Sequence, residues 1–245
     1  MDFDPQIFLQ QLISLDYLHG AYLSIVVALI SLIIATLIGF VIALGTTSKA
    51  PVAKGAARLY IWFFRSVPAL LFLLIVWNAL PQLLPMLRQD WYTPFLAACF
   101  ALGLAEAAYM AEVIRAALMS VDDGQALAAR ALGLSPWRVM QKVVIPQAVR
   151  IALPPTGNEL IGLIKYTSLA SVISLRELLT TAQVGVSITF RYAEYYAAAI
   201  VYYLVIVSVI TLIQSAVEKK FLWTSHVKPK RSAFGFFPLK RGLTS

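Results

Sequence analysis

The stretch from Tyr22 to Leu44, YLSIVVALISLIIATLIGFVIAL, decides the fold, because it contains no charged residue. A helix needs about 20 consecutive, mostly apolar residues to cross a bilayer. Four further stretches meet this length approximately, at Val67–Leu87, Thr93–Met119, Ile151–Ile173 and Tyr195–Val217. The sequence therefore predicts an all-α integral membrane protein with five transmembrane helices.

The composition of the 245-residue chain supports this prediction. It is 60% hydrophobic and 13% charged, and its mean hydropathy is +0.78. Soluble domains are about half apolar and roughly a quarter charged, so too few polar residues remain here to cover a water-soluble surface. The net charge of +8 is then better explained by basic loops beside a membrane than by binding to nucleic acid.

Two of the five stretches have unusual features. The second follows an amphipathic segment, Lys54–Phe64. The fourth is interrupted by Pro154, Pro155, Glu159 and Lys165. Since a broken helix in lipid needs neighbours to satisfy its freed backbone groups, the fourth segment is expected to face protein or a transport pathway.

Basic residues are distributed unevenly between the loops. One set of loops carries Lys49, Lys54, Arg58, Arg130, Arg138, Lys142 and Arg150, and the tail adds seven more, whereas the opposite side has only Arg88, Arg176 and Arg191. Cytoplasmic loops collect Lys and Arg. We therefore expect the N-terminus outside the cell and the C-terminus in the cytoplasm, with a transmembrane domain over residues 1–218 and a basic cytoplasmic tail over residues 219–245 that can touch membrane lipid.

The long loop over about residues 120–150 predicts two short helices. The first begins near Asp122 or Asp123 and ends at Gly133. The second has Ser135 as its N-cap and Pro136 in its first turn, and it is expected to end before Pro146. The first helix is rich in alanine and therefore slim, so it could fit a groove on a partner protein. A DNA-reading role is disfavoured, because the loop carries few charges and is tied to the bilayer.

Several motifs in and around this loop resemble those of binding-protein-dependent ABC importer permeases. The loop motif runs from Gly124 to Gly133 and continues in VIPQAVR, residues 144–150. YMAEVIR (109–115), LPPTGNE (153–159), KYTSLASV (165–172) and RSVPAL (65–70) resemble motifs of the polar amino acid branch of that family. The resemblance covers about residues 20–229 and implies a type I ABC importer permease fold with a cytoplasmic coupling helix.

The resemblance also implies partners and contact residues. Two permease subunits would form the pathway, two ATPase subunits would each bind one coupling helix, and a periplasmic binding protein would deliver the solute. The residues implied in coupling to the ATPase are Gly124, Gln125, Ala128, Ala129, Ala131, Leu132, Gly133 and Pro146. The chain has no phosphate-binding loop of the Walker type, so ATP and Mg²⁺ are expected only in the partner ATPase, and the chain is expected to be no enzyme.

The sequence departs from the family pattern at informative positions. Leu127 stands where the coupling loop usually has Glu, Tyr166 where Asp is frequent, and Ser66-Val67 where Gly-Thr is usual. Because Leu127 removes the usual carboxylate, a heterodimer whose second permease supplies it is favoured over a homodimer. The tail motif HVKP (226–229) is similar to members that handle histidine and other basic amino acids, so basic amino acids or opines are the expected solutes.

Six polar residues within the spans are candidates for the substrate pathway: Glu106, Asn158, Glu159, Lys165, Thr167 and Ser168. Glu106 could attract a cationic solute or make a helix–helix hydrogen bond, and both readings stay open. Asn158, Lys165 and Ser168 share a helical stripe that could line the pathway or join helices at a dimer centre, and Lys165 could hold the carboxylate of Glu159 or of the solute.

Other polar residues are expected to be structural. Glu112 and Arg115 are expected to pair near the cytoplasmic end, and Arg65 is expected to anchor at the interface. No metal site is expected, because Cys99 is the only cysteine and His19 and His226 would lie on opposite sides. The alternative function is a secondary transporter or channel without ATPase partners, which the lack of an internal repeat disfavours.

Overall fold

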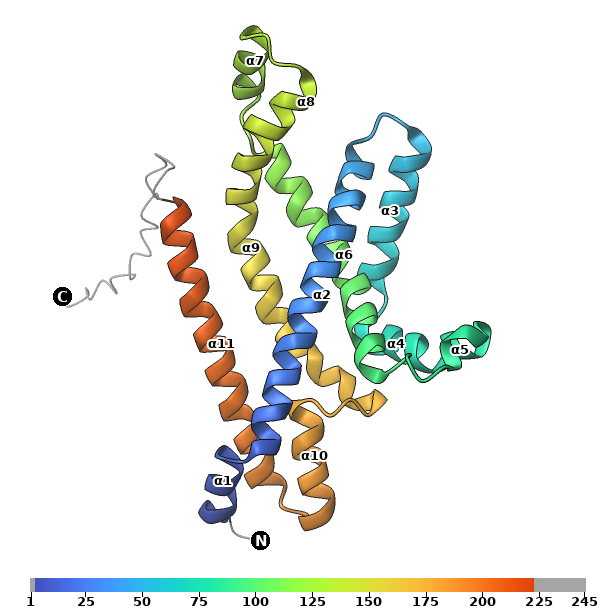
Figure 1. Cartoon of the computed structure of the whole chain (residues 1–245), viewed down its shortest axis with the longest axis vertical. Coiled ribbons are helices and arrows are strands. Elements are labelled where there is room, and N and C mark those ends of the chain that lie inside the picture. Colours follow the sequence, from blue (N-terminus) through green and yellow to red (C-terminus); the bar gives the residue numbers. More distant parts are fainter. Residues whose placement is uncertain (1–2, 223–245) are drawn as a thin grey trace, which may run out of the picture.

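The computed structural model describes residues 3–222, and every regular element in that range is helical. Four long helices lie side by side: α2 (Leu15–Thr47), α6 (Pro94–Met119), α9 (Ile145–Tyr166) and α11 (Tyr192–Leu222) (Figure 1). The short helices α1 (Pro5–Leu12) and α10 (Leu178–Thr189) lie at one end of this bundle. The helices α7 (Asp123–Ala131) and α8 (Pro136–Val139) project from the opposite end. The all-α membrane fold predicted from the sequence is confirmed.

The membrane-spanning helices agree only in part with the five that were predicted. By length and composition, α2, α6 and α11 are the described helices that can cross a bilayer, and they correspond to the predicted first, third and fifth spans. A bent pair of helices, which begins at Pro51, adds a fourth span if it is counted as one. The fourth predicted span, residues 151–173, is divided between α9 and the 3₁₀ helix η4 (Thr167–Ile173).

The predicted second span, Val67–Leu87, is wrong as a continuous helix. Helix α3 (Pro51–Ser66) occupies the predicted amphipathic segment and packs against α2 and α6. The chain then turns by 101° into α4 (Ala69–Leu74). Pro68 explains the break, because proline disfavours the helical conformation at the preceding residue, and Val67 is extended with φ −89° and ψ 129°. Beyond α4, the π-helix η1 (Ile75–Ala79), α5 (Leu80–Leu83) and the 3₁₀ helix η2 (Pro85–Arg88) form an arm beside the bundle.

Helix α9 stays helical through both of its internal prolines, so the predicted interruption is absent there. It contacts α2, α6 and α11, which agrees with a segment expected to face protein. Neighbouring groups stabilise the segment: the Gln214 side chain donates a hydrogen bond to the Pro154 carbonyl at 3.0 Å, and the Thr156 hydroxyl donates to the Ala152 carbonyl at 2.8 Å. The Gln214 hydrogen bond joins this part of α9 to α11.

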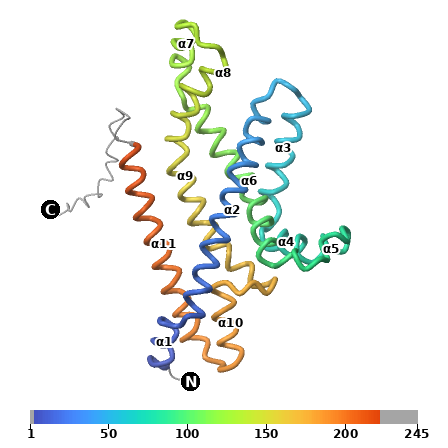
Figure 2. The backbone as a smooth tube through the Cα atoms, viewed as in Figure 1, coloured from blue at the N-terminus to red at the C-terminus, as the bar shows by residue number. Residues whose placement is uncertain are grey.

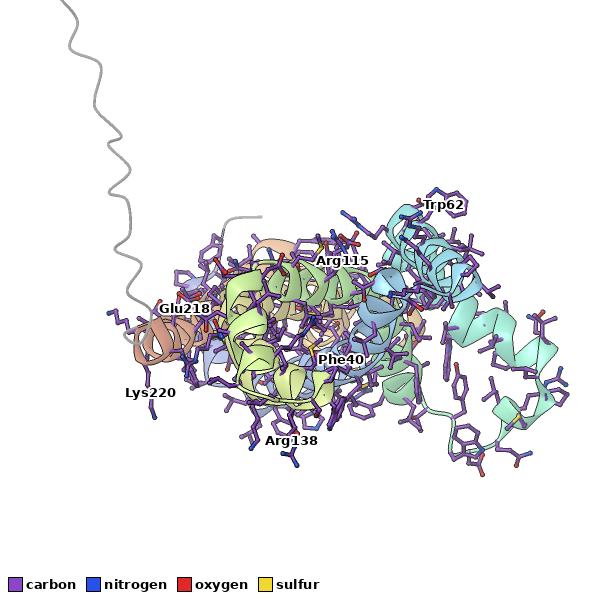
Figure 3. The ribbon with its side chains drawn as sticks, turned by 90° about the horizontal axis from the view of Figure 1, so that it is seen from above. Phe40, Trp62, Arg115, Arg138, Glu218 and Lys220 are labelled. Carbon is purple, nitrogen blue, oxygen red and sulfur yellow. The ribbon has the colours of Figure 1, made fainter. Side chains whose placement is uncertain are left out.

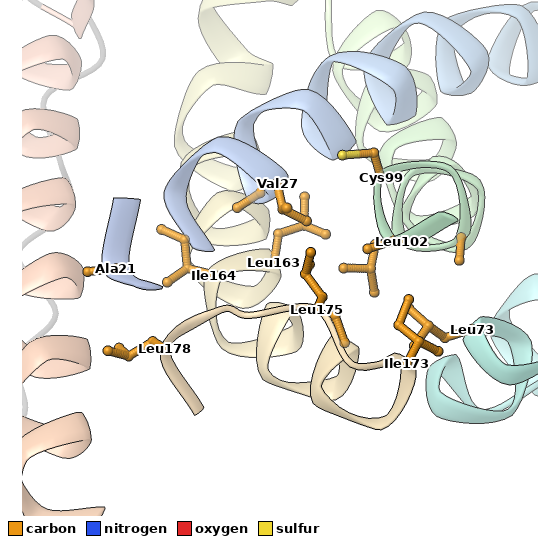
Figure 4. Close-up of a cluster of buried hydrophobic side chains, with 14 of the residues drawn as sticks. Ala21, Val27, Leu73, Cys99, Leu102, Leu163, Ile164, Ile173, Leu175 and Leu178 are labelled. Atoms are coloured by element: carbon orange, nitrogen blue, oxygen red, sulfur yellow. The ribbon is translucent and has the colours of Figure 1, made fainter. Parts of the chain in front are cut away.

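The core lies where α2 and α6 meet the ends of α9 and α10. Val27, Cys99, Leu102, Leu163 and Leu178 are buried there, in one cluster from four helices (Figure 4). Helix α6 is central, because 61% of its most apolar window is buried, compared with 17% for α11. The apolar surface that α11 leaves exposed is suited to lipid.

Small residues let α2 and α6 approach closely. Ala35, Gly39 and Ala43 of α2 are buried, as are Ala107 and Ala111 of α6. A Cβ atom added at Gly39 would lie 2.9 Å from the Ala111 nitrogen and 3.0 Å from the Ala107 carbonyl oxygen. Membrane helices commonly associate through such small residues, since lipid provides no hydrophobic force between them.

Replacing Gly39 by valine is expected to lower the free energy of unfolding by about 1–3 kcal/mol, because backbone atoms of α6 cannot move aside for the larger side chain. The unfolding temperature of the purified protein in detergent measures this loss. Gly55→Val is the matched control, because a Cβ atom at Gly55 meets nothing within 4 Å. Equal unfolding temperatures for the two variants would contradict the close approach of α2 and α6.

Basic residues gather at the end of the bundle that carries α7. The turn between α2 and α3, the α7–α8 region and the last turn of α11 all lie at that end (Figure 2). They contribute Lys49, Lys54, Arg130, Arg138, Lys142, Lys219 and Lys220. Arg176 and Arg191 are at the opposite end, near α10. The remaining tail residues, including the motif at residues 226–229, lie outside the described residues.

Candidate functional site

The α7 helix forms as its end signals predict. The Asp122 carboxylate caps the N-terminus by accepting a hydrogen bond of 2.6 Å from the Gly124 amide. At the other end Gly133 has φ +82°, a conformation in which glycine carries no steric penalty. The amides of Gly133 and Leu134 donate to the carbonyls of Arg130 and Ala129, which completes a Schellman motif.

One face of α7 is free. Leu127 and Ala128 lie three and four residues after Gly124, Ala131 lies four and three residues after them, and all four are exposed. Gln125, Leu132, Gly133 and Pro146 are also exposed, so Ala129 is the single predicted coupling residue that is buried. Ala129 faces the opposite way, because α7 packs against the π-helix η3 (Met140–Val144). The free face thus consists of small residues and one leucine.

Three large apolar side chains extend this free surface. Leu127, Leu132 and Trp137 are 62%, 82% and 70% exposed at the tip of the molecule. Seen from that end, Arg138 also projects outward from the tip (Figure 3). Exposed apolar side chains that adjoin one another are a feature that many protein-binding surfaces share.

The second helix of the loop differs from its prediction. Ser135 and Pro136 begin α8 as expected, but the helix does not end before Pro146. It passes through η3 directly into α9, because the Ile145 amide bonds to the Met140 carbonyl five residues back. Such a π-bulge shifts the backbone ahead of a proline and lets the helix continue. The same arrangement precedes Pro81, where η1 leads into α5. As a result, α7 is tied to α6 on one side and to a continuous α8–α9 rod on the other.

A cavity of about 410 Å³ lies between α6, α9 and the break that follows α3. Its lining includes Arg65, Pro68, Glu106, Tyr109, Leu163 and Tyr166. The Arg65 guanidinium lies 5.3 Å from the centre of the Tyr109 ring, which is within the range of a cation–π contact. Arg65 was expected to be an interfacial anchor, but the structure places it on the same cavity as Glu106.

Glu106 is the acidic side chain that lines this cavity. It is 4% exposed, and its Oε1 atom is buried without a hydrogen-bond partner among the described residues. The Glu159 carboxylate of α9 is close enough to interact with it. Two negative charges side by side in a region of low dielectric repel one another, so the fully ionised pair is costly unless a positive charge lies nearby. The contact between Glu106 and Glu159 joins α6 to α9, as the expected helix–helix hydrogen bond would.

The other pathway candidates lie along α9 and η4, and Asn158 and Lys165 are seven residues apart on one continuous helix. Asn158 Oδ1 accepts a hydrogen bond of 3.5 Å from Gln214 of α11, whereas Lys165 is exposed and has no ion-pair partner in the described range. Thr167 is buried and Ser168 is half-buried, and their hydroxyls donate to the carbonyls of Ile164 and Lys165 at 2.7 Å. Their side chains therefore satisfy backbone groups near the junction of α9 and η4.

Glu112 and Arg115 form the predicted ion pair. Arg115 Nη2 lies 2.6 Å from Glu112 Oε2, and both side chains are about one-third exposed. The pair lies on α6 toward the end that carries α7, outside the cavity of Glu106. Its expected structural role agrees with this position.

Sequence reasoning missed a buried polar cluster at the opposite end of the bundle. Glu177 is 0% exposed and caps α10, accepting hydrogen bonds from the amides of Leu179 and Thr180 at 2.8 and 2.7 Å. The Tyr203 hydroxyl lies 3.3 Å from Glu177, and the Ser24 hydroxyl accepts from the Leu178 amide at 3.4 Å. The cluster joins α2, α10 and α11. Only the N-cap position of Glu177 could have been read from the sequence.

The chain has extensive similarity to known transport proteins. The family model for binding-protein-dependent transport system inner membrane components matches residues 35–223. The probable amino-acid permease protein YxeN of Bacillus subtilis is 38% identical over 197 residues, which cover 80% of this chain and 87% of that protein. The octopine transport system permease protein OccM of Rhizobium meliloti is 36% identical over 236 residues, which cover 94% and 95%.

The fold comparison agrees with the sequence comparison. A crystal structure of an amino acid ABC transporter with histidines matches with a TM-score of 0.77 and 32% identity, covering 90% of this chain and 99% of that one. The family resemblance and the type I importer permease fold predicted from the loop motifs are therefore confirmed. The chain belongs to the family of binding-protein-dependent transport system inner membrane components.

Proposed function

We propose that the chain is a permease subunit of an ABC importer that translocates polar, and in particular basic, amino acids or opines. The observation that carries this proposal is the exposed face of α7, which joins directly to the two helices that wall the Glu106 cavity. The names of relatives that transport octopine and arginine support the class of solute. A periplasmic binding protein delivers the solute, and separate ATPase subunits hydrolyse ATP with its Mg²⁺.

The geometry suggests how ATP hydrolysis drives transport. An ATPase that closes on ATP moves the α7 tip, and α6 and the α8–α9 rod carry this movement into the bundle. Glu106 lies on α6, and Leu163 and Tyr166 lie on α9, so both walls of the cavity shift together. The permease is then an element with two states, biased by ATP on one side and by the solute on the other.

The cavity offers groups that suit an amino acid. The Arg65 guanidinium can bind a carboxylate with two parallel hydrogen bonds. Glu106, with Glu159 beside it, attracts an ammonium or guanidinium group. A basic amino acid carries both kinds of charge, and an opine adds a further carboxylate.

The basic end of the bundle supports an orientation. We place the end with α7 and the last turn of α11 in the cytoplasm of a bacterium, and the end with α1 and α10 in the periplasm, because positive residues concentrate in cytoplasmic loops. The chain then lies in the inner membrane. In this orientation the tail over residues 219–245 is cytoplasmic, and residues 1–218 form the permease domain.

The partner permease is a different chain in this proposal. Leu127 is exposed at the centre of the free face of α7, where members of the family usually have Glu. A heterodimer keeps one such carboxylate at the second coupling helix, whereas a homodimer has none.

Affinity purification from the native membrane in mild detergent, followed by mass spectrometry, tests these partners. We expect an ATPase and a second, different permease to co-elute with the chain. A complex with two copies of this chain and an ATPase would contradict the heterodimer and keep the importer. A stable chain without any ATPase would contradict the importer and favour a secondary transporter or channel.

A further inference from the structure

A second cavity, of about 540 Å³, lies at the α7 end of the bundle between α2, α3 and α6. Its polar lining includes Thr46 and Thr47 at the end of α2, Lys54 and Arg58 on α3, and Glu112 and Arg115 on α6. It is separate from the cavity of Glu106, with which it shares no lining residue. The proposed transport mechanism does not use it.

The charge of this cavity is positive. Lys54, Arg58 and Arg115 contribute three cations and Glu112 one carboxylate, a net charge of +2. Glu112 forms an ion pair with Arg115, whereas neither Lys54 nor Arg58 has an ion-pair partner among residues 3–222. Two cations one helical turn apart, without a counterion from the described protein, are suited to an anion.

The cavity lies where α2 and α6, which span the membrane, come to their ends at Thr47 and Met119. It is therefore at the level of the lipid headgroups. One turn beyond Arg58, Trp62 also lines the cavity, and it is 65% exposed beside the exposed Leu59 and Phe63. Trp62 and Arg115 lie toward the same side of the molecule (Figure 3). Tryptophan is enriched at this depth of the membrane, and the apolar side chains offer a surface for acyl chains.

We propose that this cavity binds the phosphate of an anionic phospholipid. Arg58 and Lys54 hold the phosphate oxygens, and the acyl chains lie along the exposed apolar side of α3. Basic pockets between transmembrane helices are suited to anionic headgroups. A lipid is favoured over a soluble phosphate compound, because the basic residues adjoin exposed apolar side chains at the membrane surface.

Native mass spectrometry of the purified transporter complex, incubated with phosphatidylglycerol or with zwitterionic phosphatidylethanolamine, tests this site. Replacing Lys54 and Arg58 together by alanine is expected to lower the preference for phosphatidylglycerol on the order of tenfold, since each basic residue near a membrane surface contributes measurably to binding anionic lipid. Glu112→Gln is expected to change the preference in the opposite direction, because it removes the only carboxylate lining the cavity and releases Arg115.

The matched control replaces Lys219 and Lys220 by alanine, which removes the same charge at the same end of the bundle but outside the cavity. An equal loss in this control would overturn the site, as would an unchanged preference in the Lys54 and Arg58 variant. Millimolar inorganic phosphate is expected not to displace the lipid. Displacement by phosphate would overturn the assignment to a lipid and show that the cavity takes a soluble anion.

Discussion

Replacing Ala128 by tryptophan will abolish ATP-driven uptake while the chain remains folded in the membrane. Ala128 is exposed at the centre of the free face of α7, between Gly124, Leu127 and Ala131. If this face fits a groove of the ATPase, the indole ring holds the two surfaces apart. Disruption at the centre of an interface can weaken the free energy of binding by about 2 kcal/mol or more. We therefore expect uptake to fall at least about 30-fold.

The measurement is uptake of a radiolabelled amino acid into proteoliposomes that contain the whole transporter, with the binding protein outside and ATP enclosed. Ala50→Trp is the matched control, because Ala50 is also exposed at that end of the molecule but lies in the turn before α3. Co-elution of the ATPase distinguishes lost docking from lost coupling. Normal uptake by the Ala128 variant would contradict docking through this face of α7.

The features that sequence reasoning predicted correctly depend on local signals. The uncharged stretch of α2 requires lipid or burial along its whole length. Asp122 and Gly133 mark the two ends of α7, because each satisfies backbone groups within its own turn. The loop motif between them identified the family before any contact between distant helices was known.

The errors arose where the backbone depends on prolines. Lys54 and Arg58 count against a continuous apolar stretch, so the second span was placed after them. The amphipathic segment was predicted only up to Phe64, whereas α3 continues to Ser66. Prolines were read as breaks at residues 146, 154 and 155, but the rod stays helical through all three, and the π-helix η3 precedes Pro146. Pro68, by contrast, does break the chain.

The sequence predicted individual residues of the candidate site but not which of them lie close together. Glu106 and Glu159 were each suspected because ionisable groups in a membrane are costly. Their proximity depends on the packing of α6 against α9, and the position of Arg65 over Tyr109 depends on the turn of 101° after α3. Likewise, the neighbouring sequence does not show that Ala129 is buried and Ala128 exposed, because this difference depends on the packing of α7 against η3.

Glu106→Gln is expected to lower the uptake of a cationic amino acid such as arginine by about tenfold or more. The glutamine side chain has nearly the same shape but no charge. The carboxylate lines the cavity and is buried, and a hydrogen bond to a charged group is worth about 1.5–3 kcal/mol. The uptake of glutamine, whose side chain is neutral, should fall much less, so the ratio of arginine to glutamine uptake is the quantity to measure.

Asp90→Asn is the control for removing a carboxylate, because Asp90 is exposed in the turn before α6 and lines neither cavity. The unfolding temperature shows whether the Glu106 variant keeps its fold. If arginine and glutamine uptake fall together, Glu106 maintains the structure between α6 and α9 and does not select the solute. If only arginine uptake falls, the buried acid of α6 recognises the positive charge, and the ATPase-driven movement of α6 acts directly on the residue that holds the solute.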